Sequence, residues 1–536
     1  MRFLPEVNYN PDLKVWSGVD EDPIFDPKLS LGEIIFTEMR RHPQLIAQIS
    51  ATENTVLTRE ELFLNSKSVA SYLRNMNLQQ SDIIGIVARN TTHSSSVAYG
   101  CLFNGQAFHS LNVNHAQATI ERLYDITKPR VIFCDGDEYE KISTATAKLN
   151  VKIVTLRNHK PGSISIEDVL STPIKDGFKP YKLEKGNDQT MAIISSSGTT
   201  GVPKAVTNCG THKFFMTTKY LTTADVAYCH STLDWVSGVT ATISTAVHST
   251  TRVIVDGGFD PALILSLIEK HKITWFLGSP PMMAMMANSP NFESTNLDSL
   301  KHFIYGGACA SVEVQDRFRK RLPRGAMEFG FGFSELSSSN CTINMYYDEK
   351  PNAVGRVCSG TKLKIVNPER EALPPNQLGE ICIHPGHYWD GYFLNPEETQ
   401  QAQDREGWLY TGDTGYVDDD GFLYISGRIK DMLKYQGLMY YPSEVEDIIT
   451  KMPGVAEVCV FGIPHETNWY ENAATVVIKR GSNITAEDVV KYVANNTDAN
   501  YLQLNAGVLI VSDIKRLPNG KTNRQAAKEY FLANKN

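Results

Sequence analysis

Short runs of apolar, mostly β-branched residues recur along the first 305 residues, and polar segments separate them. Runs of about four to eight such residues, bounded by turn residues, predict buried strands. Many precede segments of helical period, such as SVEVQDRFRKRL from Ser311. This alternation predicts an α/β fold with mostly parallel sheets. The predicted strands are residues 83–88, 130–134, 151–156, 191–195, 252–255, 273–277 and 301–305.

The pattern changes twice in the second half of the chain. Near residues 355–384, KLKIVN and GEICIHPG are strand-like and separated by turn residues, which predicts a small antiparallel or β-barrel-like part. After residue 427, Ser443 and Glu446 form a capping-box pattern, and a further helix opens at Thr485 between strand-like runs. We therefore expect a large N-terminal domain, residues 1–426, and a small α+β domain, residues 427–536, joined by a hinge.

Composition supports a multidomain globular protein. The 536 residues are 42% hydrophobic and 21% charged, and the net charge of -8 argues against a nucleic-acid partner. No apolar run approaches the roughly 20 residues of a membrane span. The nine cysteines include no C-x-x-C pair, which favours buried thiols in a reducing compartment over disulfides or a zinc site.

The loop SSSGTTGVPK, residues 195–204, concentrates residues that can bind a phosphate group. Glycines allow close backbone approach, hydroxyls and N–H groups bind anionic oxygens, and Lys204 adds positive charge. Composition alone leaves a solvated surface loop open as the alternative. The spacing does not match a Walker loop, because Val-Pro separates Gly201 from Lys204.

Four further motifs follow this loop: FGFGFSE (329–335), GWLYTGD (407–413), GRIKDMLKYQG (427–437) and LPNGKTNR (517–524). Together, in this order and spacing, they resemble the adenylate-forming superfamily of acyl-CoA synthetases, coumarate-CoA ligases and beetle luciferases. The general character is nearest to insect luciferase-like acyl-CoA synthetases. The resemblance implies that ATP activates a carboxylic acid as an acyl-adenylate with release of pyrophosphate, and that coenzyme A then takes the acyl group. It also implies Mg²⁺ and a C-terminal domain that rotates between the two steps.

The resemblance assigns a role to each matching residue. Lys521, Lys204 and Glu335 would be catalytic, with Glu335 on Mg²⁺ and Lys521 at the reacting carboxylate. Asp413 would bind the ribose with help from Arg428. The residues implied for the β- and γ-phosphates are Ser196, Ser197, Gly198, Thr199, Thr200, Gly201 and Lys204; those implied for adenine and the α-phosphate are Phe331, Gly332 and Ser334.

The same resemblance places Lys430 at the hinge. It makes Trp235, Gly238, Gly306, Gly307 and Ala308 candidates for the acyl pocket. For GGACA, residues 306–310, a tight turn is the alternative. Trp235 stands where luciferases carry histidine, which puts light emission in doubt and leaves a shorter or aromatic acid open.

Several other positions depart from the family pattern. Ala205 and Gln436 replace a common glycine and lysine, and Phe331 and Ser334 replace tyrosine and threonine. Met439 and Tyr470 depart at positions related to the thioester step.

The leading interpretation is an AMP-forming acid–CoA ligase, with a medium- or long-chain fatty acid as the expected substrate. An adenylating, luciferase-like enzyme with another acyl fate or an aryl acid is one alternative, and an inactive acyl- or nucleotide-binding homologue is another. The C-terminal FLANKN lacks the Ser-Lys-Leu peroxisomal signal, so we expect a cytoplasmic protein. The sequence does not indicate an oligomeric state.

Overall fold

In the computed structural model the chain forms two compact units. Unit 1 comprises residues 1–10, 15–363 and 383–409, and unit 2 comprises residues 11–14, 364–382 and 410–536. The predicted domain boundary between residues 426 and 427 stays a prediction. The described residues are 5–196, 204–209, 218–307, 310, 312–323, 327–336, 342–344, 350, 352–387, 389–436, 438–517 and 521–535.

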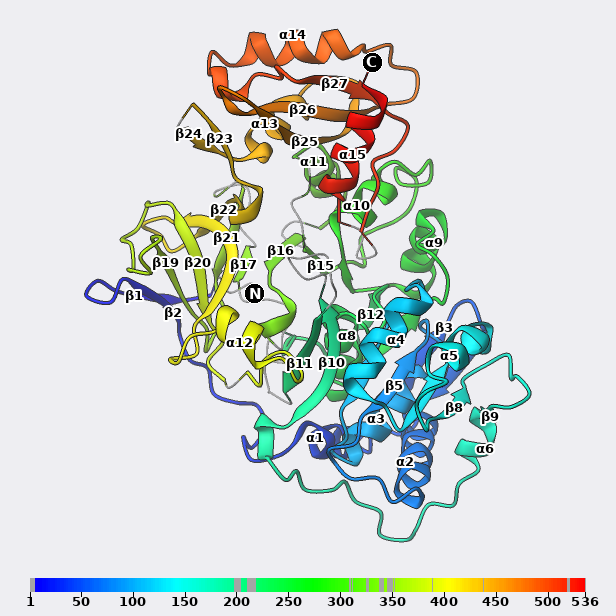
Figure 1. Cartoon of the computed structure of the whole chain (residues 1–536). Coiled ribbons are helices and arrows are strands. Elements are labelled where there is room, and N and C mark those ends of the chain that lie inside the picture. Colours follow the sequence, from blue (N-terminus) through cyan, green and yellow to red (C-terminus); the bar gives the residue numbers. More distant parts are fainter. Residues whose placement is uncertain are drawn as a thin grey trace. The chain divides into compact units, whose positions relative to one another are not determined.

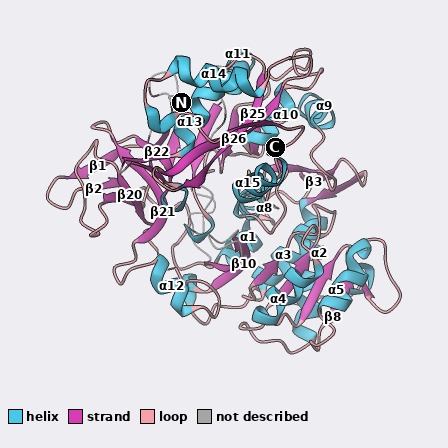
Figure 2. Cartoon of the chain, turned by 45° about the horizontal axis from the view of Figure 1, so that its top comes forward, coloured by secondary structure: helices cyan, strands magenta, loops and turns pink. Residues whose placement is uncertain are grey.

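The first sheet of unit 1 has seven strands, which are parallel except for the hairpin at one edge. Helices pack around it, as Figures 1 and 2 show for α2 to α5. The strand order is β11 (Lys204–Cys209), β10 (Thr190–Ser196), β6 (Phe108–Ser110), β5 (Ile84–Val87), β7 (Val131–Cys134), β8 (Lys152–Thr155) and β9 (Ile164–Ser165). The helices are α2 (Arg59–Asn75), α3 (Ser94–Phe103), α4 (Gln117–Thr127), α5 (Tyr139–Ala145) and α6 (Ile166–Leu170).

The second sheet of unit 1 has a parallel centre and antiparallel edges. Its strand order is β18 (Ala353–Val357), β17 (Thr342–Asn344), β16 (Met327–Phe331), β15 (His302–Gly306), β14 (Trp275–Gly278), β12 (Val226–Cys229), β13 (Thr251–Ile254), β3 (Ile46–Ser50) and β4 (Thr55–Thr58). Among the described residues, the remaining α-helices of unit 1 are α1 (Leu31–Glu38), α8 (Val236–Val247), α9 (Pro261–His271), α10 (Pro280–Ala287), α11 (Val312–Arg321) and α12 (Pro396–Ala402). The strand β1 (Val7–Asn10) pairs with β2 (Val15–Gly18).

Unit 2 contains a five-stranded sheet with helices packed on it. Apolar residues of the sheet and of two helices, many of them valines, form one buried core, among them Val445, Val460 and Val489. Its strands are β23 (Leu433–Tyr435), β24 (Leu438–Tyr440), β25 (Val455–His465), β26 (Trp469–Ile478) and β27 (Gly507–Ile510), and its helices are α13 (Pro442–Ile449), α14 (Ala486–Asn496) and α15 (Arg524–Asn534).

The fold class predicted from the sequence is confirmed, and two details need correction. The part expected to be barrel-like is an open row of strands, and within the described residues its ends do not pair to close a barrel. The row is β19 (Lys362–Val366), β20 (Gly379–His384), β21 (Leu409–Val417) and β22 (Leu423–Arg428).

The predicted capping box at Ser443 and Glu446 is wrong. The helix α13 begins earlier, at Pro442, because the fixed φ of proline suits the first helical position. Glu444 therefore accepts the N–H of Tyr441 at 2.8 Å. Ser443 instead donates its hydroxyl to the Ser426 carbonyl at 2.9 Å.

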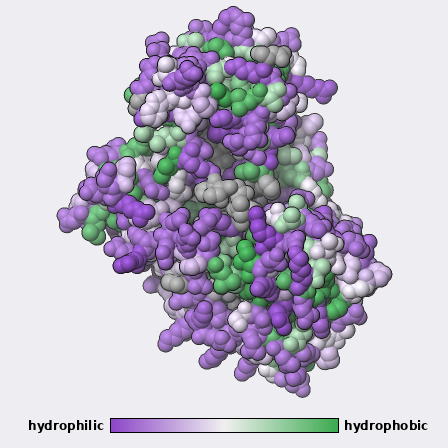
Figure 3. All heavy atoms as spheres, viewed as in Figure 1, coloured by the Kyte–Doolittle hydropathy of each residue, from purple (hydrophilic) through white to green (hydrophobic). Residues whose placement is uncertain are grey.

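The seven described cysteines are all buried as thiols and not as disulfides. The face of the molecule in Figure 3 is mainly hydrophilic, and its apolar residues lie in separate groups. Within the described part of the chain, none of the helices combines the length and the apolar character that crossing a bilayer requires.

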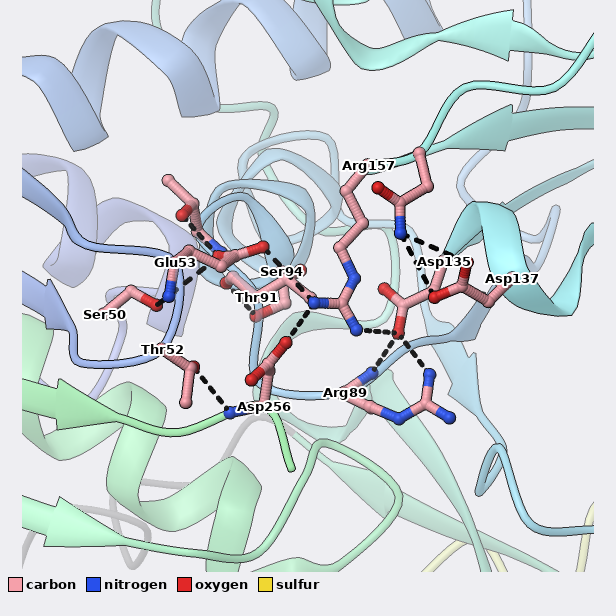
Figure 4. A network of polar contacts seen from close by, with 12 residues as sticks. Ser50, Thr52, Glu53, Arg89, Thr91, Ser94, Asp135, Asp137, Arg157 and Asp256 are labelled. Carbon is pink, nitrogen blue, oxygen red and sulfur yellow. Dashed lines mark hydrogen bonds and ion pairs between the residues drawn. The ribbon is translucent and has the colours of Figure 1, made fainter. Parts of the chain in front are cut away.

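An ion network joins the two sheets of unit 1 (Figure 4). Its members follow the carboxyl ends of five strands, which meet because parallel strands present their ends at one edge. Asp135 accepts from Arg89 at 3.1 Å and from Arg157 at 3.3 Å in the first sheet. Arg157 also pairs with Asp256 and, at 3.6 Å, with Glu53, both beside the second sheet. The guanidinium of Arg157 thus bridges the sheets through carboxylates on both sides.

The buried histidine His109 in β6 makes the folded state sensitive to acid. Its side chain has no exposed surface, and its Nδ1 lies 2.8 Å from the Thr127 hydroxyl. Burial lowers the pKa of His109 to about 3, whereas a histidine in the unfolded chain titrates near 6.5. The unfolded state therefore binds the proton first, so stability falls as the pH drops from about 6.5 toward 3.

We expect His109→Leu to remove this part of the acid sensitivity. At pH 5 the group costs the wild type about 2 kcal/mol relative to neutral pH, and leucine cannot be protonated. Thr127 keeps its hydrogen bond to the Leu123 carbonyl in the variant. Urea unfolding at pH 7.5 and pH 5 measures the difference, and His42→Leu at an exposed position is the control. An equal pH dependence of His109→Leu and wild type would refute the assignment.

Candidate active site

The predicted phosphate loop connects the two strands of a β-hairpin. Strands β10 and β11 pair antiparallel, and the last pair before the loop is Ser196 with Lys204. Ser197, Gly198, Thr199, Thr200 and Gly201 lie outside the described residues, as does the side chain of Ser196. The hairpin therefore positions the Lys204 backbone at the base of the loop.

The side chain of Lys204 belongs to a polar cluster that includes Glu335. Lys204 pairs with Glu398, and its Nζ lies 4.8 Å from the centre of the Tyr392 ring. The Tyr392 hydroxyl donates to Glu335 Oε1 at 2.8 Å. Burial, and then the charge of Glu335, raise the pKa of Tyr392 well above its usual range, so the phenol stays protonated as the donor. Two residues predicted to be catalytic are thus brought together through Tyr392.

Sequence reasoning missed Tyr392 and Glu398. Both lie in GYFLNPEET, residues 391–399, which packs beside the hairpin. Tyr392 forms a bridge with Val206, and the N–H of Phe393 donates to the Ala205 carbonyl at 2.8 Å. The only local signal is Pro396 with acidic residues in the first turn of α12, which predicts a helix start rather than a binding site.

The residues predicted for adenine and the α-phosphate directly precede Glu335 in the chain. Phe331 ends β16, and Ser334 and Glu335 lie in a 3-10 helix, Ser334–Leu336. Phe331, Gly332, Ser334 and Glu335 are all partly buried. The Phe331 ring lies 6.3 Å from that of Phe333. The structure accordingly leaves part of each of these side chains, and of the Gly332 backbone, accessible.

Unit 2 brings the other predicted nucleotide-binding residues together. Asp413 of β21 stands directly opposite Arg428 of β22, and Arg428 Nε lies 2.9 Å from Asp413 Oδ1. Burial raises the pKa of Asp413, and the positive charges of Arg428, Lys521 and Lys430 act against that rise. Lys521 is therefore close enough to Asp413 for an electrostatic interaction, although it lies far along the chain.

The two lysines of unit 2 that were predicted to be functional, Lys430 and Lys521, are exposed. Lys430 lies in a one-turn 3-10 helix, Ile429–Asp431, directly after β22. Lys521 precedes α15 in a turn in which its carbonyl accepts the N–H of Leu517 at 2.8 Å. Of the departures related to the thioester step, Met439 lies on β24 with 64% of its surface exposed, and Tyr470 lies on β26.

Three of the predicted acyl-pocket glycines and Trp235 are described, and Ala308 lies outside the described residues. Trp235 is the partly buried N-cap of α8. Gly306 pairs with Gly330, where a Cβ would lie 2.3 Å from the Gly330 oxygen, and Gly307 has φ +86°. The close backbone approach at Gly306 and the positive φ of Gly307 both favour glycine at these positions. Their role in an acyl pocket stays a prediction.

Gly238→Ala should strongly destabilise unit 1. A Cβ there would lie 2.0 Å from the Thr232 carbonyl oxygen, so α8 or the preceding turn must move. Overpacking costs about 1–3 kcal/mol of stability where side chains can adjust. Because the added methyl group would meet a backbone atom here, we expect a loss at or above the upper end of that range. We expect a clearly lower urea midpoint than for Gly258→Ala, the control, where a Cβ meets open space. Matching midpoints would contradict the packing role.

The residues present fit a magnesium–nucleotide ligand in their chemistry. Mg²⁺ is commonly bound through one or two carboxylates together with substrate phosphates, and Glu335 offers a partly buried carboxylate near Lys204. The buried Asp413 paired with Arg428 offers an acceptor suited to hydroxyl groups.

Comparison with known proteins adds independent information. A family model described as AMP-binding enzyme matches residues 35–393, and one described as AMP-binding enzyme C-terminal domain matches residues 444–521. 4-Coumarate–CoA ligase 1 of Petroselinum crispum is 27% identical over 519 residues, covering 94% of each chain. The luciferase-like enzyme of the nonluminescent mealworm Zophobas morio is 27% identical, with a TM-score of 0.70 over 78% of this chain and 99% of that one. ATP-bound MatB of Rhodopseudomonas palustris has a TM-score of 0.82 at 24% identity, over 94% of this chain and 99% of that one.

Proposed function

Because the chain belongs to the AMP-binding enzyme family, we propose that it is an AMP-forming acid–CoA ligase. In the first step a carboxylate oxygen of the acid attacks the α-phosphorus of ATP, and the bond to pyrophosphate breaks. In the second step the sulfur of coenzyme A attacks the acyl carbon, its proton is lost, and AMP leaves. The 4-coumarate–CoA ligases and ATP-bound MatB among the similar proteins support both halves of this proposal.

The observation that carries the proposal is the link from Lys204 through Tyr392 to Glu335 in unit 1. A lysine and a carboxylate held beside one hairpin loop supply what a metal–triphosphate needs: a positive charge for phosphate oxygens and a hard oxygen ligand for Mg²⁺. Tyr392 restrains the Glu335 carboxylate by donating to one of its oxygens, and this carboxylate would hold Mg²⁺. Bound Mg²⁺ would neutralise phosphate charge as pyrophosphate leaves.

The residues of unit 2 complete the proposed chemistry. Asp413 would accept hydrogen bonds from the ribose hydroxyls while Arg428 fixes its carboxylate. Lys521 would place positive charge beside the negative charge that builds up as the carboxylate meets the α-phosphate. Its electrostatic interaction with Asp413 supports a place at the nucleotide. Lys430 would absorb the backbone change between the two steps.

The acid itself is proposed by class. The insect luciferase-like character of the sequence supports a medium- or long-chain fatty acid as the substrate. The similarity to 4-coumarate–CoA ligases supports an aryl acid equally well. Trp235 bears on this choice, because a partly buried indole at the start of α8 would shorten or reshape a pocket in that region.

An assay of pyrophosphate release tests the proposal. It is run with ATP and Mg²⁺ on a panel of straight-chain fatty acids and aryl acids, with and without coenzyme A. Acyl-CoA is identified by mass. We expect a preferred acid and a matching acyl-CoA. Pyrophosphate without acyl-CoA would contradict the coenzyme A step and direct attention to Met439 and Tyr470. ATP binding without pyrophosphate release across the panel would favour the inactive homologue.

A further inference from the structure

A small cavity in unit 1 is lined by none of the residues proposed for catalysis. It is bounded by β3, β13, the first turns of α2 and α3, and the last turn of α8, and two arginines, Arg59 and Arg252, line it. Its volume is about 10 Å³. For comparison, a cavity needs roughly 10–15 Å³ to hold one water molecule. The cavity therefore has room for one small species at most.

Both arginines are almost completely buried. Arg59 is 1% exposed and Arg252 is 3% exposed. The Nε of each is buried and has no hydrogen-bond partner. Within the described part of the chain neither guanidinium forms an ion pair with a carboxylate, in contrast to Arg89 and Arg157 of the network in Figure 4. Two positively charged side chains therefore line the cavity, and each has a buried Nε–H group without a hydrogen-bond partner.

The surroundings of Arg59 compensate its charge in part. It donates to the carbonyls of Glu38 at 3.0 Å and Ala246 at 2.9 Å, near the C-terminal ends of α1 and α8. Helix C-termini carry partial negative charge, so these contacts are favourable. The carboxylate of Glu38 also interacts electrostatically with Arg59, but its direct ion pair is with Arg41 at 3.2 Å.

Arg252 has no comparable compensation. Its partners are the hydroxyls of Ser95 and Thr242, at 3.3 and 2.7 Å, and the amide oxygen of Asn90 at 3.2 Å. Ser95 lies in the first turn of α3, whose N-cap, His93, makes no side-chain capping bond. The positive end of α3 therefore adds to the charge of Arg252 instead of offsetting it.

Burying charge without a counterion is costly, and guanidinium does not escape the cost by losing its proton at neutral pH. An anion in the cavity would remove the imbalance and use both free N–H groups. A halide ion is larger than a water molecule, so the side chains that line the cavity must shift outward slightly to admit it. We propose that this cavity binds one monovalent anion of halide size between Arg59 and Arg252. The small volume excludes sulfate, phosphate and carboxylate ligands.

Bromide, which scatters anomalously, identifies the occupant in crystals of the full chain grown or soaked in sodium bromide. We expect one ordered bromide within about 3.5 Å of the Nε of both arginines, a hydrogen-bonding distance for this large ion. A water molecule at that position in bromide, or a cavity without any ordered species, would overturn the proposal. This experiment needs no substitution and does not depend on the ligase activity.

A solution measurement tests the same site. The thermal midpoint should rise with sodium chloride, at ionic strength held constant with sodium gluconate, and should saturate because binding to the folded state is stabilising. We expect a rise of about 2–4 °C. Arg252→Met should abolish the chloride dependence, and Arg317→Met, on the surface beside Glu293, should retain it. If Arg252→Met does not fold, the bromide position in the wild type decides. A chloride response that Arg252→Met retains would overturn the proposal.

Discussion

Lys521→Ala is expected to reduce the rate of acyl-adenylate formation by about 10²–10³, the usual effect of removing one donor that stabilises developing charge. The exposed Lys521 side chain interacts electrostatically with Asp413 at the proposed nucleotide site. The backbone turn around Lys521 is held by main-chain contacts, including the bridge of Arg516 with Thr522, so alanine should leave the fold intact. Pyrophosphate release in the first turnover measures the adenylation step.

The assignment requires the second step to survive. When acyl-adenylate is supplied directly, Lys521→Ala should form acyl-CoA at a rate much nearer that of the wild type. Lys515→Ala, at another exposed lysine of unit 2, is the matched control and should leave both rates unchanged. Equal losses in the two steps would mean that Lys521 acts in something other than adenylation.

Asp413→Asn is expected to raise the KM for ATP by about 10–100-fold. Hydrogen bonds to a charged acceptor contribute about 1.5–3 kcal/mol, and asparagine keeps the shape while removing the charge. The substitution also leaves the Arg428 guanidinium, now 2.9 Å from the carboxylate, without its ion pair. Steady-state pyrophosphate release at varied ATP gives the KM.

Asp420→Asn is the control for Asp413→Asn, because it neutralises an exposed carboxylate in the turn between the same strands. Its KM for ATP should equal that of the wild type. An unchanged KM in Asp413→Asn, with normal folding, would show that Asp413 is only a structural partner of Arg428.

Many elements of the fold could be predicted because the local order of apolar and polar residues indicates which side chains are buried. The run RVIFC became β7, with Val131 to Cys134 all buried, and the pattern at Thr485 became the capped start of α14. The start of α13 was misjudged because two overlapping signals compete there. Ser443 and Glu446 match a capping box, but Pro442 in the preceding position determines the start.

The site residues that lie in local sequence motifs could be predicted. The contacts between segments that are distant in the sequence could not. Lys204 and Glu335 stand in recognisable motifs, whereas their connection through Tyr392 depends on residues 391–393 pairing with β11, nearly 190 residues earlier. Asp413 and Arg428 were both predicted, but their direct opposition follows from the register of β21 and β22. A single sequence does not specify such a register.

The central claim is that the acid is activated by transfer of an adenylyl group to its carboxylate. The most direct measurement uses the preferred acid with both carboxylate oxygens labelled with ¹⁸O, in the presence of ATP, Mg²⁺ and coenzyme A, followed by mass analysis of the products. The proposal predicts one labelled oxygen in AMP, one retained in the acyl-CoA, and none in pyrophosphate. Unlabelled AMP, or label in inorganic phosphate together with ADP, would contradict it.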